Sequence, residues 1–401
     1  MDSVSTGAQS RRLSPDGDEA MKDVAVIGAG KIGSMIADLL VRSGDYRVVV
    51  ADRSAEALTR LGTTLPVEVQ ELDVSDSAAV DRLLAGKFAV LSAAPYHLTV
   101  RIAEAAAKVG AHYLDLTEDV ASTRKVKAIA EDARSAFIPQ CGLAPGFITI
   151  VAANLCRRFD VLHDVRMRVG ALPKYPSNAL NYNLTWSTDG LINEYCEPCE
   201  ALVNGEPHET APLEELEEFS LDGVTYEAFN TSGGLGTLCE SLRGKARNLN
   251  YKTIRYPGHA HIMKALLNDL RLRDRRDVLK DILENALPAT LQDVVIVFVT
   301  VSGVQGGRLV QETYANKVYA RPIGGVTRSA IQITTAAGIC AALDLLRSGA
   351  LPQRGFVRHE EIGLDQFLAN RFGRHYATPE DAERAALPAA DERPAMAGAQ
   401  L

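Results

Sequence analysis

Three glycines, Gly28, Gly30 and Gly33, have the spacing G-x-G-x-x-G between a short apolar run and an amphipathic stretch. In this pattern the first glycine permits a tight turn, the second lets backbone approach a pyrophosphate, and the third lets a helix pack on a strand. A helix opening at Lys31 and Ile32 would offer free N–H groups and a positive dipole end to phosphates. The motif predicts an adenine-dinucleotide site; the alternative is a Gly-rich turn without a ligand.

Asp52 stands 19 positions after Gly33, at the end of the second predicted strand. We expect its carboxylate to accept hydrogen bonds from ribose hydroxyls and to repel a 2′-phosphate, which favours NAD over NADP. Arg53 keeps NADP open as the alternative, because a guanidinium beside the ribose can hold that phosphate. Asp73 and Val74 follow the third predicted strand and are placed to meet the adenine.

Two further backbone segments are expected beside the nicotinamide half of the cofactor, because ligands of such sheets bind at the carboxyl ends of the strands. They are Ala93, Ala94 and Pro95 after the fourth strand, and Gly142, Leu143 and Ala144 in the hinge between two domains. For the hinge, a plain inter-domain turn is the alternative.

Four side chains near the same edge could accept a proton or hold an ammonium group. Tyr96 and His97 lie just past the fourth strand, and Glu118 and Asp119 follow the fifth. The alternative for the acids is a solvated loop with a helix cap. The residues alone do not rank the four as candidate bases.

A carboxylate-binding site is predicted from the second half of the chain. The turn that contains Thr231 and Ser232 offers hydroxyls and backbone N–H groups, and Arg255 is suited to bidentate binding of a carboxylate. A structural salt bridge is the alternative for Arg255. His259 and His261 have no third ligand nearby in the sequence, so no metal site is predicted.

The elements that must position these residues alternate strand and helix in the first part of the chain. Strands are predicted at 24–27, 48–51, 67–69, 89–92 and 112–116, with helices at 55–61, 78–84, 98–108 and 123–133 and an apolar helix stripe from Ile32 to Leu40. This rhythm predicts a Rossmann-type, doubly wound parallel sheet of the α/β class. Later β-rich segments at 165–169, 180–186, 249–255 and 294–300 predict a second α+β domain on a mixed sheet.

The predicted organisation has five segments. Residues 1–20 form a flexible leader, 21–146 a NAD-binding domain, 147–325 a substrate and oligomerisation domain, 326–376 a segment that packs back on the first domain, and 377–401 a disordered tail. The returning segment is expected to contain an apolar helix at 331–346.

Composition narrows the class of protein. Among 401 residues, 43 Lys and Arg face 51 Asp and Glu, for a formal net charge of −8. This argues against a nucleic-acid groove, which needs concentrated cations. No apolar run reaches the roughly 18–20 residues of a membrane span, the first twenty residues lack the core of a secretory signal, and six scattered cysteines are no disulfide scaffold. We expect a reduced, cytoplasmic protein that acts on a small molecule, without nucleic-acid or membrane partners.

The chain resembles the saccharopine dehydrogenase (glutamate-forming) superfamily over most of residues 21–376. The resemblance is carried by the G-x-G-x-x-G start and by segments Gly142–Gly146, Trp186–Gly190, Thr231–Gly234 and Tyr251–Gly258. Within the superfamily, the order of Asn181–Asn183, Phe229–Gly234 and Tyr251–Tyr256 resembles the L-lysine 6-dehydrogenase branch.

That resemblance implies NAD-dependent oxidative deamination of the lysine ε-amine. The products would be ammonia, NADH and 2-aminoadipate 6-semialdehyde, which cyclises to 1-piperideine-6-carboxylate. It also implies a homodimer or higher homo-oligomer, and substrate contacts from Tyr96, Asn183 and Asp189. Saccharopine-oxidising relatives carry a carboxylate-binding Arg where this chain has Asp189, and an anion there suits an ammonium-bearing substrate instead.

Two alternatives stay open. The first is a saccharopine dehydrogenase, which would split a secondary amine into glutamate and the same semialdehyde. The second, of another class, is a non-catalytic dinucleotide sensor in which the carboxylates and Arg255 are structural.

Overall fold

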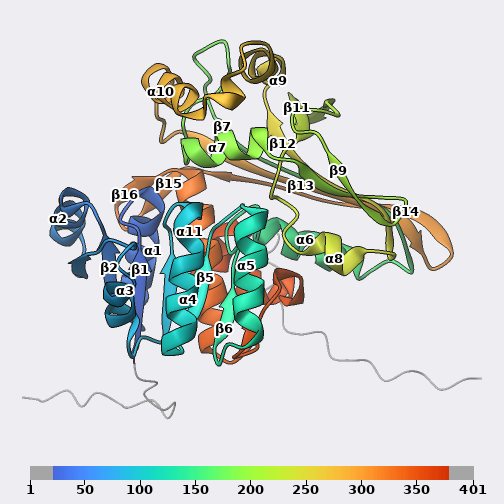
Figure 1. Ribbon diagram of the computed structural model, residues 1–401. Helices are drawn as coiled ribbons and strands as arrows, with labels where there is room; N and C mark the ends of the chain where they lie inside the picture. Colours follow the sequence, from blue (N-terminus) through green and yellow to red (C-terminus); the bar gives the residue numbers. More distant parts are fainter. Residues whose placement is uncertain (1–20, 379–401) are drawn as a thin grey trace, which may run out of the picture.

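The computed structural model describes residues 21–378, which form two layers, each built on its own sheet. In Figure 1 the first sheet and its helices form the lower layer, and the second sheet crosses above them. The predicted leader at 1–20, and the predicted tail beyond Thr378, lie outside the described residues.

The first sheet is parallel throughout, in the order β17-β6-β5-β4-β1-β2-β3. Its strands are β1 Lys22–Ile27, β2 Tyr46–Asp52, β3 Glu68–Glu71, β4 Ala89–Ser92, β5 His112–Asp115, β6 Ala136–Ile138 and β17 Gly355–Phe356. The predicted doubly wound parallel sheet is confirmed, and its order reverses between β1 and β4, where such folds bind ligands. Strands β6 and β17 were not predicted, because three and two residues show no usable periodicity.

Helices cover this sheet at the predicted places. They are α1 Lys31–Ser43, α2 Ala55–Thr64, α3 Ser77–Leu84, α4 Thr99–Val109 and α5 Val120–Glu131, with a short 3₁₀ turn, η1, at Tyr96–Leu98. Side-chain caps begin three of them, since Ser54, Asp76 and Asp119 each accept a backbone N–H of the first turn. Helix α1 begins instead after Gly30, without a side-chain cap.

The second sheet is mixed, in the order β10-β11-β12-β7-β13-β14; β8 pairs with β12, and β9 pairs with β8. Strands β7 and β12 are parallel and the other pairs are antiparallel. The strands are β7 Val161–Pro173, β8 Cys199–Val203, β9 Glu206–Thr210, β10 Glu217–Leu221, β11 Val224–Asn230, β12 Ala246–Arg255, β13 Asp293–Gln305 and β14 Arg308–Tyr319. A separate small hairpin joins β15 Arg321–Ile323 to β16 Val326–Arg328.

The strand predicted at 180–186 is wrong. The segment is a loop with a single bridge between Leu184 and Ala289. Asn181 has a left-handed backbone, with φ of 49°, and the Asn178 side chain donates to the Tyr182 carbonyl at 2.7 Å. Local bonding of an asparagine to backbone therefore outweighs the alternating apolar pattern.

Helices lie on both faces of the mixed sheet (Figure 1). Helices α7 Thr188–Cys196, α9 His259–Lys264 and α10 Arg276–Ala286 lie above it, where α9 continues into a π-turn, η2, at Ala265–Asp269 and a 3₁₀ turn, η3, at Leu272–Asp274. Helices α6 Phe147–Cys156 and α8 Leu238–Leu242 lie below.

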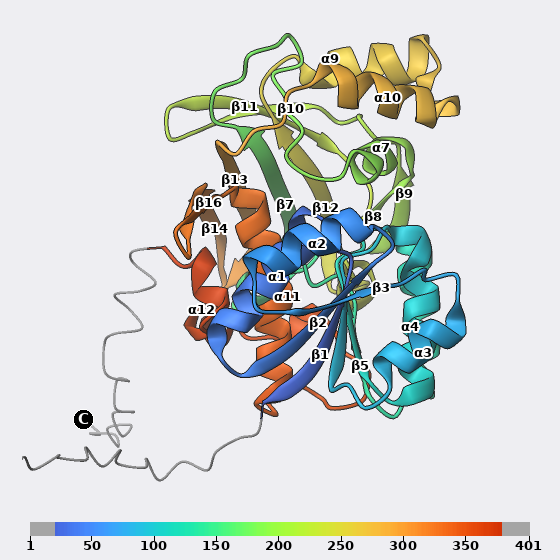
Figure 2. The same cartoon turned by 90° about the vertical axis from the view of Figure 1, so that its left-hand side faces the viewer.

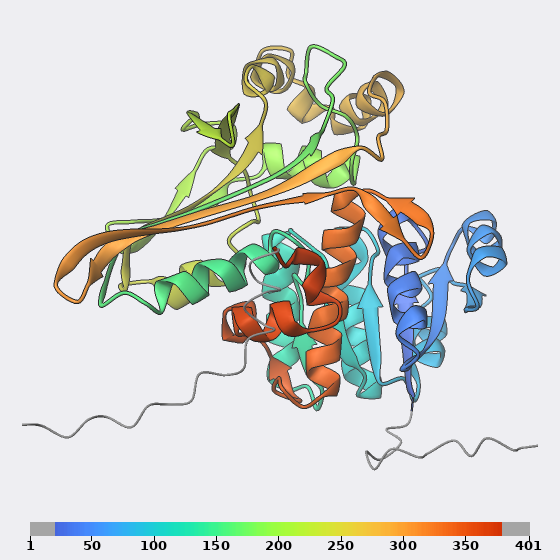
Figure 3. The same cartoon turned by 180° about the vertical axis from the view of Figure 1, so that it is seen from behind.

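Helix α11, Ala330–Arg347, joins the two layers. It begins with a capping box between Ser329 and Gln332, and the Asp293 carboxylate accepts two more of its first N–H groups. It packs against α1, and both helices belong to one continuous apolar core that also includes residues of β7 and β13. Figures 2 and 3 show the ribbons of α11 and α1 from the side and from behind. By length and hydropathy it is the one helix among the described residues that could cross a membrane, but 83% of it is buried in the protein, as in a core helix.

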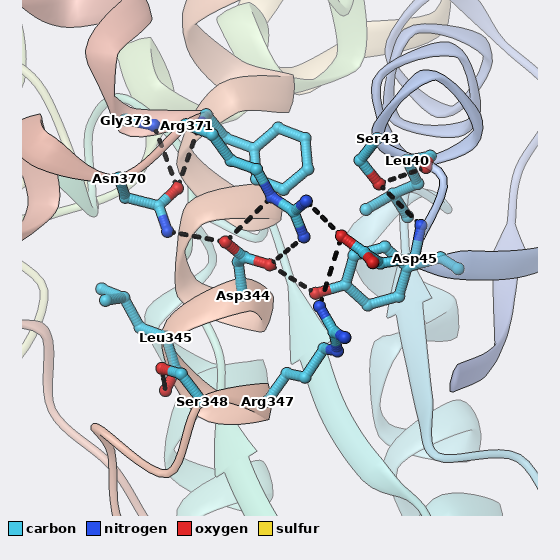
Figure 4. Close-up of polar contacts among 12 residues, drawn as sticks. Leu40, Ser43, Asp45, Asp344, Leu345, Arg347, Ser348, Asn370, Arg371 and Gly373 are labelled. Carbon is cyan, nitrogen blue, oxygen red and sulfur yellow. Dashed lines mark hydrogen bonds and ion pairs between the residues drawn. The ribbon is translucent and has the colours of Figure 1, made fainter. Parts of the chain in front are cut away.

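The chain after α11 returns to the first layer through β17, the 3₁₀ turn η4 His359–Glu361, α12 Leu364–Ala369 and the 3₁₀ turn η5 Gly373–Tyr376. Figure 4 shows how this return is held. Asp344 of α11 accepts hydrogen bonds from Tyr46 at 2.8 Å, Asn370 at 2.8 Å and Arg371 at 2.6 Å. Asp45 pairs with the same Arg371.

Candidate functional site

The Gly-rich turn has the geometry that a bound dinucleotide needs. Gly28 has a φ of 110°, and a Cβ there would lie 2.7 Å from the Ala93 carbonyl oxygen. A Cβ on Gly33 would lie 1.8 Å from the Gly28 carbonyl oxygen, so both positions require glycine. A Cβ on Gly30 would meet nothing within 4 Å, which leaves open space where a phosphate would approach the backbone.

The start of α1 is free to bind an anion. No side chain caps it and its first turn, which begins with Lys31 and Ile32, contains no acidic residue. The unpaired N–H groups and the dipole of this 13-residue helix therefore point at the space beside Gly30.

Asp52 lies beside this turn at the end of β2. The Ala29 N–H donates to its Oδ2 at 2.6 Å, and the Ser54 N–H donates to its Oδ1 at 2.8 Å. These two bonds fix the carboxylate at the carboxyl edge of the sheet. Arg53 is exposed next to it.

Asp73 and Val74, predicted near the adenine, lie in the loop after β3. The Ser75 backbone N–H donates to Asp73 at 2.8 Å, and bonds from Ser75 lower the pKa of that carboxyl. Asp73 therefore stabilises the turn in which it lies, and the Val74 side chain is buried in the core.

A cavity of about 270 Å³, partly open to solvent, lies where the carboxyl ends of β4 and β5 face the second layer. Its walls come from the first sheet, the hinge after β6, strands β7 and β12, and helices α7 and α11. They are Ile32, Ala93, Ala94, Pro95, Tyr96, Leu116, Thr117, Glu118, Gly142, Leu143, Ala144, Val169, Ala171, Trp186, Ser187, Asp189, Gly190, Glu194, Tyr251, Thr253, Arg255, Ile331 and Thr335.

The cavity collects 11 of the 24 site residues predicted from the sequence. It brings together both predicted backbone segments, at 93–95 and 142–144, with Tyr96, Glu118, Asp189 and Arg255. The Asp189 carboxylate, however, is paired with Lys280 at 2.6 Å and is half-exposed, so its charge is already met by the protein.

Two of the four candidate bases lie outside the cavity walls. Asp119 caps α5, where its Oδ1 accepts the Ser122 N–H at 2.6 Å. His97 is exposed and touches Tyr96 edge-on, with ring centroids 5.8 Å apart. The helix cap that competed with a chemical role for Asp119 is therefore the arrangement observed, and neither Asp119 nor His97 is placed to act as a base in the cavity.

Three of the predicted substrate contacts form the layer behind the wall. The Asn183 side chain is buried and accepts from Asn178 at 3.3 Å. The Thr231 hydroxyl bonds to the Thr253 hydroxyl at 2.7 Å, and the Ser232 N–H donates to the Glu194 carbonyl at 3.1 Å. The Thr-Ser turn therefore supports the cavity wall and does not itself line the cavity.

Arg255 is buried at the end of β12, in a set of neutral partners. Its Nε donates to the Tyr195 hydroxyl at 2.9 Å, and its Nη1 donates to the Ile254 carbonyl at 2.9 Å. The guanidinium also lies over the Tyr182 ring, 5.0 Å from its centroid. Within residues 21–378 no carboxylate lies within 4.0 Å of it, so its remaining donors can take an anion from the cavity.

The Tyr195 hydroxyl, which accepts the hydrogen bond from Arg255, also bonds to the buried His259. It lies 3.1 Å from His259 Nε2, and His259 Nδ1 lies 2.8 Å from the Leu180 carbonyl oxygen. Burial, with Arg255 nearby, lowers the pKa of His259 to about 3, so the ring is neutral. Nδ1 must then donate to Leu180, and Nε2 must accept from Tyr195. His259 is thus part of the support of Arg255, while His261 is exposed.

Two carboxylates line the same cavity as Arg255, namely the partly buried Glu118 and the buried Glu194. Burial raises the pKa of Glu118 to about 7, with a smaller contribution from Asp119. Burial raises the pKa of Glu194 to about 8; Arg255 opposes this and Glu118 adds to it. The space beside Glu118 is tight, because a Cβ on Gly190 would lie 3.1 Å from Glu118 Oε1 and 2.4 Å from the Trp186 ring.

The sequence analysis missed Glu194, Tyr251 and Thr253. Tyr251, Thr253 and Arg255 alternate along β12 and so share one face of the strand, a signal that was available. Glu194 lies one helical turn after Gly190 on α7, but the nine-residue helix was not predicted, and its face could not be assigned.

Fold, turn and cavity together define a two-layer α/β protein of the dinucleotide-binding class. Two family models match the chain: the saccharopine dehydrogenase NADP binding domain at residues 24–138 and the saccharopine dehydrogenase C-terminal domain at residues 142–372. The chain belongs to the saccharopine dehydrogenase family, and its first domain is of the nicotinamide-dinucleotide-binding kind.

Similar proteins agree with this assignment. Saccharopine dehydrogenase [NADP(+), L-glutamate-forming] of Saccharomyces cerevisiae is 23% identical over 63% of this chain and 59% of its own length. The mitochondrial alpha-aminoadipic semialdehyde synthase of Bos taurus is 22% identical over 74% of this chain and 33% of its own. The chain thus spans about three fifths of the fungal relative.

A solved structure shares the fold. It is the apo, histidine-tagged saccharopine dehydrogenase (L-Glu forming) from Saccharomyces cerevisiae, with a TM-score of 0.72 and 17% identity over 84% of this chain and 94% of that chain.

Proposed function

We propose that this protein is an NAD-dependent L-lysine 6-dehydrogenase, a family member that oxidises the lysine side-chain amine. The charge balance of the cavity is the observation on which this rests. Its walls contain one cation, Arg255, and two carboxylates without a basic partner, Glu118 and Glu194. Lysine has one carboxylate and two ammonium groups, which is the complementary set.

Arg255 is the group that would hold the α-carboxylate of lysine. Its guanidinium is fixed by Tyr195 and Ile254 and has no carboxylate partner within the described chain. A carboxylate bound there leaves the four-carbon side chain to extend toward the other charges of the cavity. This placement holds the reacting carbon in one position, a condition for efficient transfer.

Glu118 is the group that would accept a proton from the ε-ammonium. Only a neutral amine can push electrons toward an imine, and the free ε-ammonium has a pKa near 10.4. A carboxylate whose pKa is raised to about 7 is a stronger base than an exposed one, and it is still ionised in part at neutral pH. The same group can return the proton when water adds to the imine and ammonia leaves.

The residues around the Gly-rich turn fit a nicotinamide dinucleotide. The open space at Gly30 and the uncapped start of α1 suit its pyrophosphate, and Asp52 suits the adenosine ribose. When bound, this cofactor supplies the hydride acceptor for the reaction. Asp52 supports NAD, although the family model and the fungal relatives carry NADP in their names.

Saccharopine oxidation is the second candidate, and the names of the relatives favour it. Saccharopine carries three carboxylates, however, and the cavity wall offers one cation against three acids, of which Asp189 is neutralised by Lys280. Two substrate carboxylates would then lie without a cationic partner, which is costly in a buried site.

A direct comparison tests this proposal. The purified full chain is given L-lysine or saccharopine with NAD or NADP, and formation of reduced cofactor is followed by absorbance. We expect turnover with lysine and NAD. Turnover with saccharopine alone would reject the lysine assignment, and faster turnover with NADP than with NAD would reject the role given to Asp52.

A further inference from the structure

Glu194 is a buried carboxyl group that has no hydrogen-bond or ion-pair partner among residues 21–378. Its side chain is 7% exposed and lines the cavity, and within residues 21–378 its carboxylate makes no hydrogen bond or ion pair. Its main-chain carbonyl accepts the Ser232 N–H at 3.1 Å. Burying a polar group without a partner costs free energy, so this carboxylate needs a partner from whatever fills the cavity.

Arg255 lies close to this carboxylate without neutralising it directly. The two groups interact electrostatically, yet they are not within the 4.0 Å of an ion pair. Arg255 is turned instead toward Tyr195 and the Ile254 carbonyl. The cavity wall therefore presents a guanidinium and an ionisable carboxyl group that interact electrostatically, each with free bonding capacity.

An α-amino acid carries the complementary pair of charges on a single carbon. We propose that Glu194 binds the α-ammonium group of an amino-acid substrate whose α-carboxylate lies on Arg255. This inference deepens the proposed function, on which it rests for the identity of the substrate side chain. It assigns the site to α-amino acids and excludes diamines and ω-amino acids as good ligands.

The two other acids that line the cavity, Glu118 and Asp189, have different surroundings and different roles. Glu118 lies on the loop after β5, beside Gly190 and Trp186, and is the group proposed to take the side-chain proton. Asp189 lies on the same helix as Glu194 but is paired with Lys280. Asp189 is therefore a matched control for Glu194.

Two unreactive ligands isolate the α-ammonium contact. L-Norleucine has the α-ammonium, the α-carboxylate and a four-carbon side chain but no ε-amine, and hexanoate lacks the α-ammonium as well. Titration calorimetry of the full chain with NAD present measures both affinities. We expect the wild type to bind norleucine roughly ten- to a hundredfold more tightly than hexanoate, the effect of one hydrogen-bonded charge pair.

Substitution then assigns the preference to one residue. Glu194→Gln should bind norleucine and hexanoate about equally while keeping the hexanoate affinity of the wild type, because Arg255 is unchanged. Asp189→Asn should keep the norleucine preference. A Glu194→Gln protein that retains the preference would overturn the proposal.

A measurement on the wild type alone covers the case in which Glu194→Gln fails to fold. Burial raises the pKa of Glu194 to about 8. The titratable groups that interact with it electrostatically are Glu118, Arg255, Cys199 and the tyrosines 182, 195 and 251. A bound ammonium favours the charged carboxylate, so norleucine should release protons at pH 7 and hexanoate should not. Equal proton release by both ligands, read from calorimetry in two buffers, would overturn the proposal.

The outcome is independent of turnover, because norleucine has no ε-amine, the group that the proposed reaction oxidises. Norleucine selectivity that depends on Glu194 in a protein that does not oxidise lysine would keep this site and reject the proposed function. If the protein oxidises lysine but its preference for norleucine does not depend on Glu194, the proposed function stands and the role given to Glu194 is rejected.

Discussion

Glu118 combines two properties of a general base that works near neutral pH: it lines the cavity, and burial raises its pKa to about 7. A base must be ionised in the enzyme–substrate complex, so kcat at saturating lysine should rise with pH below about 7 and level off above it. Replacing the carboxylate by an amide, Glu118→Gln, should lower kcat by about 10²–10⁴-fold and remove the rise of the rate with pH below about 7. Steady-state rates between pH 5.5 and 9 provide the measurement.

The Glu194→Gln variant serves as the control for this profile. It should weaken lysine binding but keep the rise of kcat with pH below about 7, because Glu118 is still present. If Glu118→Gln retained that rise, the proton would belong to another group, and Tyr96, which also lines the cavity, would be the next candidate.

Single residues also show how much of the candidate site could be predicted from the sequence. The glycines at 28 and 33 and the carboxylate at 52 were predicted because each meets a local requirement of the strand-turn-helix unit. Asp119 shows the limit, since an acid after a strand can serve either a reaction or a helix cap, and spacing does not separate the two. Glu194 was missed because its neighbours come from other elements.

Among the elements, β12 and α7 together form the amino-acid half of the cavity. Strand β12 supplies Tyr251, Thr253 and Arg255, and α7 supplies Glu194 and the Tyr195 hydroxyl that orients Arg255. These segments are separated by about fifty residues of chain, and their pairing follows from the mixed sheet. Sequence periodicity predicted β12 itself but could not reveal which helix would face it.

The Tyr195 hydroxyl joins α7, β12 and α9 through one atom. It accepts from Arg255 and donates to the neutral His259, so its loss frees the guanidinium to turn. Tyr195→Phe should raise KM for lysine and weaken hexanoate binding by about tenfold, while kcat changes by less than about threefold. Steady-state kinetics and calorimetry measure these effects.

Tyr182→Phe is the matched variant, since it keeps the ring that stacks on Arg255. It should leave the hexanoate affinity close to that of the wild type. An equal loss in both variants, or a loss of kcat without a change in KM for Tyr195→Phe, would contradict a role in positioning Arg255.

At the scale of the whole molecule, the layers are held together at a distance from the chemistry. Asp344 on α11 accepts from Tyr46 at the start of β2 and from Asn370 and Arg371 in the returning chain (Figure 4). The cavity lies at the carboxyl ends of the strands, whereas Tyr46 begins its strand, so this cluster and the site occupy opposite edges of the sheet. Stability and activity should therefore separate in variants of the cluster.

Asp344→Asn tests that separation. The amide cannot match the charge of Arg371 or accept all three donors, so the free energy of unfolding should fall by about 1–3 kcal/mol. Urea denaturation measures the loss, and Asp365→Asn, an exposed acid on α12, should change stability by less than about 0.5 kcal/mol. KM values for lysine and NAD should stay at wild-type levels, because α11 keeps its apolar contacts with α1 and its capping box. A raised KM in Asp344→Asn would mean that the returning chain also sets the shape of the cavity, through Ile331 and Thr335 at the other end of the same helix.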